Sequence, residues 1–191
     1  MKKLLKSIVA CLGLISIVAA TESPVYAQSR PGALSITAGG GYDFFSSKRR
    51  MDNTGIGFLA IGYDFTCRWG VEAFFAGFRT NFKRSVDDNR RINGTIAAFD
   101  AVYHFDAYNA FGREPYTIQP YLLAGFGAIG LNPTLTDANN EGNANGGIGV
   151  ALTLHRMLAL RLEARDFYTF VGGKNDVTVG AALSVIFDTC C

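Results

Sequence analysis

Apolar side chains fall at every second position along most of this chain. The pattern is clearest near the end, where one face would carry Val177, Val179, Ala181, Leu183, Val185 and Phe187. The opposite face would carry small or polar residues and one larger apolar residue, namely Thr178, Gly180, Ala182, Ser184 and Ile186. Alternation with a period of two is typical of a β-strand. We therefore expect a strand here with one apolar face and one small or polar face.

The same alternation recurs eight times. The predicted strands cover residues 34–43, 56–63, 69–79, 92–105, 118–131, 145–154, 158–170 and 177–187. Short connections at 64–68 and 155–157 alternate with mostly longer polar ones at 44–53, 80–91, 132–142 and 171–176, while 106–117 is a long link in a short-turn position. Short turns on one side and longer loops on the other are typical of outer-membrane barrels.

The repeated strands predict a closed sheet. Lipid cannot hydrogen-bond a free strand edge, so a spanning sheet must close on itself. We therefore predict an all-β fold, an eight-stranded antiparallel up-and-down transmembrane β-barrel. An even strand number places both termini on the short-turn side, which faces the periplasm.

The first 27 residues have the features of an export signal. Lys2, Lys3 and Lys6 precede an apolar run over 4–20, and Val25-Tyr26-Ala27 is a small-x-small cleavage site. We predict a signal peptide at 1–27 and a barrel domain at 28–191, located in the outer membrane of a Gram-negative bacterium. Cleavage removes three lysines and one glutamate from a chain of net charge +2, so the mature chain is formally neutral. A neutral chain argues against a nucleic-acid partner.

Five ionisable residues alternate toward the predicted lumen. They are Glu72, Asp100, Arg161, Glu163 and Arg165. A buried charge is costly without a partner, so these groups are expected to pair and fill the barrel. Two interpretations remain open: a purely structural polar plug, or a gate in which an exchange of ion-pair partners opens a narrow path.

Enzymatic and cofactor motifs are weak in this chain. The letters Gly125-Phe-Gly-Ala-Ile-Gly130 match a dinucleotide fingerprint, but they lie inside a strand pattern and are followed by Leu131-Asn132-Pro133 where a helix should begin. His104 and His155 are the only histidines. His155 lies in a predicted turn, and His104, at the periplasmic end of its strand, has no serine at a nearby aligned position with which to build a catalytic triad. We expect no enzyme, no cofactor and no metal site.

The mature chain keeps three cysteines, Cys67, Cys190 and Cys191. An odd number makes no disulfide framework, but export places these thiols in an oxidising compartment. All three are expected on the periplasmic side. A bridge from Cys67 to either tail cysteine is therefore one hypothesis, and three unpaired thiols are the alternative.

Aromatic and basic residues suggest where the lipid lies. Aromatic residues near strand ends fit interfacial girdles, namely Tyr42, Phe44, Tyr63, Trp69, Tyr103, Phe105 and Tyr121. Basic residues in the first two long loops are candidates for contact with the phosphates of lipopolysaccharide, namely Lys48, Arg49, Arg50, Lys83, Arg84, Arg90 and Arg91. The alternative is solvated loop charge, balanced by Asp87 and Asp88.

Short motifs carry a family resemblance over essentially the whole mature chain. Gly62-Tyr63 followed by Gly70-Val71-Glu72, and later Ala159-Leu160-Arg161-Leu162-Glu163, resemble strands of the OmpA-like transmembrane domain. The stretch 99–105 and Pro120-Tyr121 are more similar to the OprF branch. The resemblance implies that Glu72 and Arg161 form a lumenal gate pair. The competing lysine of the best-known member has no match, because Asp100 fills its place.

The resemblance also bears on assembly and function. Ala182, Val185 and Phe187 resemble the final-strand signal that the outer-membrane assembly machinery recognises, with alanine in place of the usual glycine. The expected function is envelope structure and surface contact, with at most a narrow gated pore and an unidentified host or surface ligand. A small-solute porin is the main alternative. A soluble secreted ligand-binding barrel is a further alternative, against which the inward charges argue.

Overall fold

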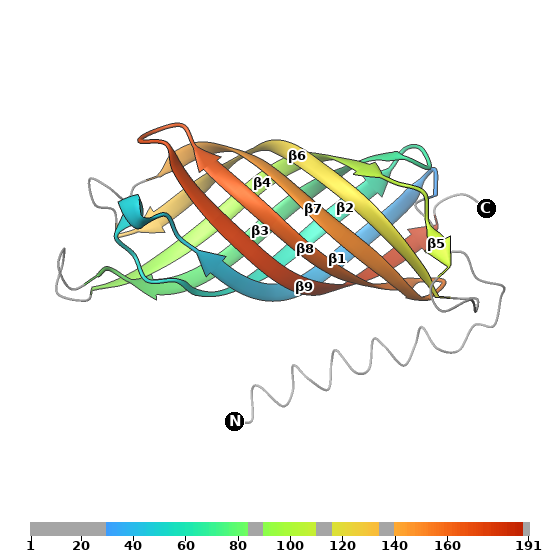
Figure 1. Cartoon of the computed structure of the whole chain (residues 1–191), viewed down its shortest axis with the longest axis horizontal. Helices are drawn as coiled ribbons and strands as arrows, with labels where there is room; N and C mark the ends of the chain where they lie inside the picture. The colour runs from blue at the N-terminus through green and yellow to red at the C-terminus, as the bar shows by residue number, and fades with distance from the viewer. Residues whose placement is uncertain (1–29, 84–89, 110–115, 134–139, 189–191) are drawn as a thin grey trace, which may run out of the picture.

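The computed structural model describes residues 30–83, 90–109, 116–133 and 140–188 (Figure 1). The strands are β1 (Ala33–Phe44), β2 (Thr54–Asp64), β3 (Trp69–Asn81), β4 (Arg91–His104), β5 (Tyr108–Asn109), β6 (Thr117–Asn132), β7 (Glu141–His155), β8 (Leu158–Thr169) and β9 (Lys174–Asp188). One turn of 3₁₀-helix, η1 (Ser47–Arg49), follows β1. Within the described residues, no helix is long and apolar enough to cross a membrane.

Eight long strands close into a barrel. Each long strand pairs antiparallel with the next long strand in the sequence, and β1 pairs with β9 to complete the ring. The short β5 is skipped in this order, because β4 pairs directly with β6. β5 adds only two pairs to β6, at Tyr108 and Asn109. The predicted eight-stranded antiparallel barrel is confirmed, and β5 accounts for part of the long link at 106–117.

The barrel has two different ends, both visible in Figure 1. The short-turn end carries the start of β1, the end of β9, β5 and the turn between β2 and β3. The loop end carries η1 and the turn between β8 and β9. These two names are used below.

The predicted inward and outward phases are confirmed along the strands. Large apolar side chains cover the outer face, with Phe126 71% exposed as the extreme case. Most of the predicted girdle aromatics also lie exposed. Tyr121 is the exception, because it is only 2% exposed and faces the lumen. The girdle assignment of Tyr121 is therefore wrong, and the outward position of Leu122 next to it gives the reason: neighbouring residues of a strand point to opposite faces.

Two predicted loops are shorter than expected. β9 begins at Lys174 and β7 at Glu141, so Asp176 and Glu141 belong to strands instead of loops. Gly172 and Gly173, with φ of +75° and +54°, make the tight turn before β9. The strands continue here beyond the apolar band of the barrel, and their polar side chains face the lumen. In the sequence these polar residues therefore resemble a loop.

The loop half of the lumen has an apolar core. Buried side chains from β2, β3, β4, β6 and β8 form it together with residues next to η1. The cluster is Phe45, Met51, Ile56, Ala60, Phe74, Ala76, Phe78, Phe82, Ile92, Ile96, Ala98, Ile129, Leu131 and Phe167. A packed lumen is expected for eight strands, because the interior of such a barrel is just wide enough for side chains to fill.

Candidate functional site

A network of ion pairs occupies the middle of the lumen. Glu72 of β3 receives Arg161 Nη1 on Oε2 and Arg165 Nη2 on Oε1, each at 2.5 Å. Both arginines come from the inner face of β8, where Glu163 lies between them. The structure therefore brings Glu72 and Arg161 into contact across the barrel, and adds Arg165 as a second partner of the same carboxylate.

Arg165 is the centre of the network. Its Nη1 donates to Asp100 Oδ2 at 2.6 Å, and its Nε donates to Glu163 Oε1. Its guanidinium also lies over the ring of Phe74, with 4.1 Å between Cζ and the ring centroid. Because Phe74 belongs to the apolar core, Arg165 joins the charged layer to the apolar layer.

Tyr121 completes the network on the other side. Its hydroxyl donates to Glu163 Oε2 at 2.6 Å and accepts from Arg161 Nε at 3.1 Å. Arg161 also donates from Nη2 to Glu163 at 2.9 Å and from Nη1 to Thr37 Oγ1 at 3.2 Å. Sequence reasoning missed Tyr121, although its inward phase in the alternation was the signal that could have found it.

Strand register explains why these groups meet. Glu72 stands directly opposite Asp100 on β4, and Asp100 stands opposite Gly125 on β6. A Cβ at Gly125 would lie 2.1 Å from the carbonyl oxygen of Phe99 and 2.3 Å from Asp100 Oδ1. Gly125 is therefore needed for the close approach of β4 and β6, and the fingerprint-like letters around it lie in a strand.

The network is buried and carries excess negative charge. Three carboxylates face two guanidiniums, and every one of the five side chains is at most 11% exposed. Removing one partner of such a pair costs about 3–5 kcal/mol, because the other charge stays buried without compensation. The ion pairs can therefore stabilise the closed barrel or, if they exchange partners, open a narrow path through the lumen.

A second buried ion cluster lies at the loop end. Arg49 of η1 is 0% exposed and donates from Nε to Asp176 Oδ2 at 2.6 Å, and its Nη2 lies 3.6 Å from Glu141 Oε2. Lys174 also pairs with Glu141, and Thr178 donates to Asp43 Oδ1 at 3.1 Å. We expected Arg49 on the surface against lipopolysaccharide. That assignment is corrected, because η1 turns Arg49 into the lumen where carboxylates of β7 and β9 receive it.

Hydrogen bonds between backbone and side-chain groups hold η1 at the loop end. The amide of Ser46 donates to Asp176 Oδ1 at 3.0 Å, and Lys48 Nζ donates to the carbonyls of Gly172 and Gly173 at 3.1 and 2.8 Å. Met51 next to η1 is buried in the apolar core and bridges to Phe82. Together, residues 45–51 form a lid, and we use that name for them below.

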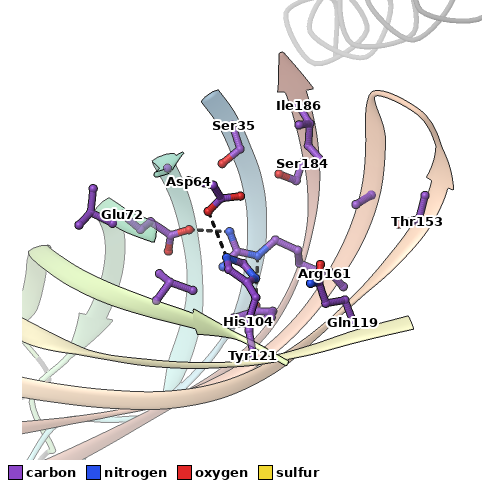
Figure 2. Close-up of a pocket in the computed structure, with 15 residues that line it drawn as sticks. Ser35, Asp64, Glu72, His104, Gln119, Tyr121, Thr153, Arg161, Ser184 and Ile186 are labelled. Atoms are coloured by element: carbon purple, nitrogen blue, oxygen red, sulfur yellow. Dashed lines mark hydrogen bonds and ion pairs between the residues drawn. The ribbon is translucent and has the colours of Figure 1, made fainter. Parts of the chain in front are cut away.

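The short-turn end of the lumen is hollow. A cavity of about 60 Å³ with an open mouth lies there, and we call it the vestibule. Its floor is formed by Glu72, Arg161 and Tyr121, and its walls include Asp64 with His104 Nε2 at 3.2 Å from Asp64 Oδ1 (Figure 2). Further polar lining residues are Ser35, Gln119, Thr153 and Ser184. The lumen is thus open at this end and filled at the other.

The remaining predicted site residues do not join the network. Ala182 faces the lumen and is buried, whereas Val185 and Phe187 face outward on β9. Cys67 is exposed in the turn after β2, and Cys190 and Cys191 lie outside the described residues. The assembly signal and the disulfide therefore stay predictions.

The predicted lipopolysaccharide residues other than Arg49 lie on the surface or outside the described residues. Lys48, Arg50, Lys83, Arg90 and Arg91 are exposed at the loop end. The described ranges do not include Arg84, Asp87 and Asp88, nor the predicted signal peptide. In those ranges, no cluster of three or more His, Cys, Asp or Glu side chains is arranged to hold a metal ion.

Comparisons with known proteins agree with this architecture. The model of the outer membrane protein beta-barrel domain matches residues 7–187. Neisserial surface protein A is similar with a TM-score of 0.62 at 14% identity, covering 82% of this chain and 99% of that chain. The N-terminal barrel of Pseudomonas aeruginosa OprF gives 0.58 at 16% identity, covering 82% and 98%. No curated protein matches the chain.

A third similar structure contains a ligand. It is the attachment invasion locus protein Ail of Yersinia pestis in complex with the heparin analogue sucrose octasulfate, with a TM-score of 0.50 at 18% identity, covering 82% of this chain and 99% of that chain. At these identities the similarities show a shared fold.

Proposed function

The chain belongs to the outer membrane protein β-barrel domain family, which locates it in a Gram-negative outer membrane, and we propose that it serves there as a closed structural barrel with surface contacts. The proposal includes at most a narrow, rarely open path through the lumen, and no catalytic activity. In the usual orientation of such barrels, the short-turn end faces the periplasm and the loop end faces outward.

One observation carries this proposal: the lumen is filled in successive layers. From the short-turn end inward, the network of Glu72, Arg161 and Arg165 comes first, and Phe74 with the apolar core follows. The lid closes the loop end through the buried Arg49–Asp176 pair. A solute would need to displace all of these layers, so a change in the ion network alone does not open a path.

Conductance of the refolded protein in planar bilayers tests the proposal. The wild type should stay closed almost all of the time. The double variant Glu72→Gln/Arg49→Ala weakens the network and the lid but leaves the apolar core in the lumen, so it should also stay closed almost all of the time. Continuous wild-type conductance would instead support the small-solute porin, and would overturn the closed barrel.

A second proposal concerns lipopolysaccharide at the loop end. Arg79 and Arg91 stand on neighbouring strands with exposed, outward-facing side chains, and Arg79 Nε donates to Asn93 Oδ1 at 2.8 Å. Arg50 and Lys83 are exposed nearby, where the Lys83 amide donates to the carbonyl of Arg50 at 2.8 Å. Such a group of outward cations fits lipid phosphates at the level of the head groups. Ail bound to a sulfated ligand supports anion contact by this fold.

Co-purification with lipopolysaccharide tests this contact. Arg79→Gln/Arg91→Gln should reduce the lipopolysaccharide retained by the purified barrel. The variant Arg68→Gln is the control, because Arg68 is also an exposed arginine but lies at the short-turn end and should not affect retention. Equal retention by wild type and the double variant would refute the contact.

A further inference from the structure

We propose that the periplasmic vestibule is a binding site for a small organic cation that carries a primary ammonium group on a short apolar chain. The inference rests on the proposed function in one respect: a closed lumen makes the vestibule a dead end, in which a solute binds instead of passing through. The cavity opens only toward the short-turn side, and the ion network forms its floor.

The vestibule wall next to Gly62 is the position of the ammonium group. Gly62 stands between Ser35 of β1 and Glu72 of β3 in the strand register. A Cβ at Gly62 would lie 2.6 Å from Ser35 Oγ and 3.9 Å from Glu72 Oε2. Ser35 Oγ therefore leans over Gly62 into the place that a side chain would take, so that a hydroxyl and a carboxylate oxygen both reach this part of the vestibule wall.

Asp64 supplies a third acceptor on the same strand as Gly62. Its side chain is 21% exposed, lines the vestibule, and uses Oδ1 for His104 (Figure 2). An ammonium group has three N–H donors, and a hydroxyl and two carboxylates are all acceptors for it. Each carboxylate oxygen has more than one acceptor site, so Glu72 accepts the ligand without releasing Arg161.

The charge balance favours a cation over an anion. Among the residues that line the vestibule, Asp64 and Glu72 supply two carboxylates, whereas Arg161 supplies one guanidinium. An anion would also compete for Arg161, whose donors already serve Glu72, Glu163, Tyr121 and Thr37.

The rest of the cavity suits a short apolar chain. Val102, Ala151, Ala159 and Ile186 contribute apolar wall. Ile186 is the one larger apolar residue on the inner face of β9, and the vestibule accounts for its position. Burial of a short alkyl chain against these residues adds a favourable hydrophobic contribution to binding.

Titration with three probes of one shape tests the proposal. Propylammonium, 1-propanol and propionate carry a positive, zero and negative charge on the same chain. Refolded, isotope-labelled protein in micelles is followed by NMR at the backbone amides of Ser35, Gly62 and Asp64. Propylammonium should give saturable shifts at these amides, whereas 1-propanol and propionate should not saturate at tenfold higher concentration.

Two variants and one matched control locate the site. Asp64→Asn removes one acceptor charge and should weaken propylammonium binding about tenfold. Gly62→Ala adds a methyl group that must displace Ser35 Oγ, and it should abolish binding while the amide spectrum elsewhere stays native. Asp106→Asn removes the same charge at the same end of the barrel, from an exposed side chain outside the vestibule, and should leave binding unchanged.

Several results would overturn the inference. These are equal saturation by all three probes, preference for propionate, the absence of saturable shifts, or an equal loss of affinity in Asp64→Asn and Asp106→Asn. The outcome is separate from the test of the proposed function, because binding is measured by NMR and closure by bilayer conductance. A barrel that stays closed and binds none of the probes would leave the proposed function standing and refute this inference alone.

Discussion

Replacing Arg165 by methionine removes the side chain that joins the three carboxylates of the lumenal network. Arg165 forms ion pairs with all three carboxylates, Glu72, Asp100 and Glu163, whereas Arg161 forms ion pairs with two of them, Glu72 and Glu163. Methionine keeps an unbranched side chain that packs against Phe74 but carries no charge. The variant therefore tests the ion pairs more than the packing.

The structure sets the expected magnitude. Wild type has three carboxylates against two guanidiniums, and Arg165→Met leaves three carboxylates against one. Asp100 is fully buried and loses its guanidinium partner. We expect the free energy of unfolding to fall by about 3–5 kcal/mol, the usual cost of breaking a buried ion pair from one side. Glu72→Gln should cost less, because it leaves two carboxylates against two guanidiniums.

The free energy of unfolding can be measured by urea titration in lipid, with Trp69 as the probe. Trp69 is the only tryptophan and faces outward, so its fluorescence changes when the barrel leaves the lipid. Arg68→Met is the matched control, since Arg68 and its partner Asp106 are 58% and 77% exposed. Exposed pairs contribute about 0–1 kcal/mol. If Arg165→Met and Arg68→Met destabilise the barrel equally, the reasoning about the buried network is wrong.

Three further predictions concern other parts of the barrel. Arg49→Ala should lower the free energy of unfolding by about 3 kcal/mol, because Asp176 and its neighbours lose a buried cation, whereas Arg50→Ala on the exposed side of the lid should change it by less than about 0.5 kcal/mol. Phe187→Ala should reduce the amount of heat-modifiable, assembled protein in the outer membrane more than Phe126→Ala does, and equal amounts would contradict a role in the assembly signal. Non-reducing mass spectrometry of membrane-purified protein should find Cys67 linked to a tail cysteine, and a thiol that remains fully alkylatable would rule the bridge out.

The sequence alone determined the strands and the face on which most side chains lie. Alternation along β3 and β8 is enough to place Glu72, Arg161 and Arg165 in the lumen, where the structure has them buried or nearly so. The physical reason is that the period of two is a local property of an extended backbone, so each strand displays it without reference to its neighbours. Closure followed as well, because lipid leaves no alternative for an exposed strand edge.

Only the tertiary structure decided which charges meet and where the lumen closes. Arg161 and Glu72 are 89 residues apart, and Arg49 and Asp176 are 127 apart, so their contacts depend on the register of all the intervening strands and on the pairing of β1 with β9. Arg49 lies between two strands, where no periodicity predicts the direction of its side chain. Its charge is buried because carboxylates of β7 and β9 lie at the same level along the barrel axis. Strand pairing likewise assembles the vestibule, where Gly62 lies between Ser35 and Glu72, a neighbourhood that no single segment contains.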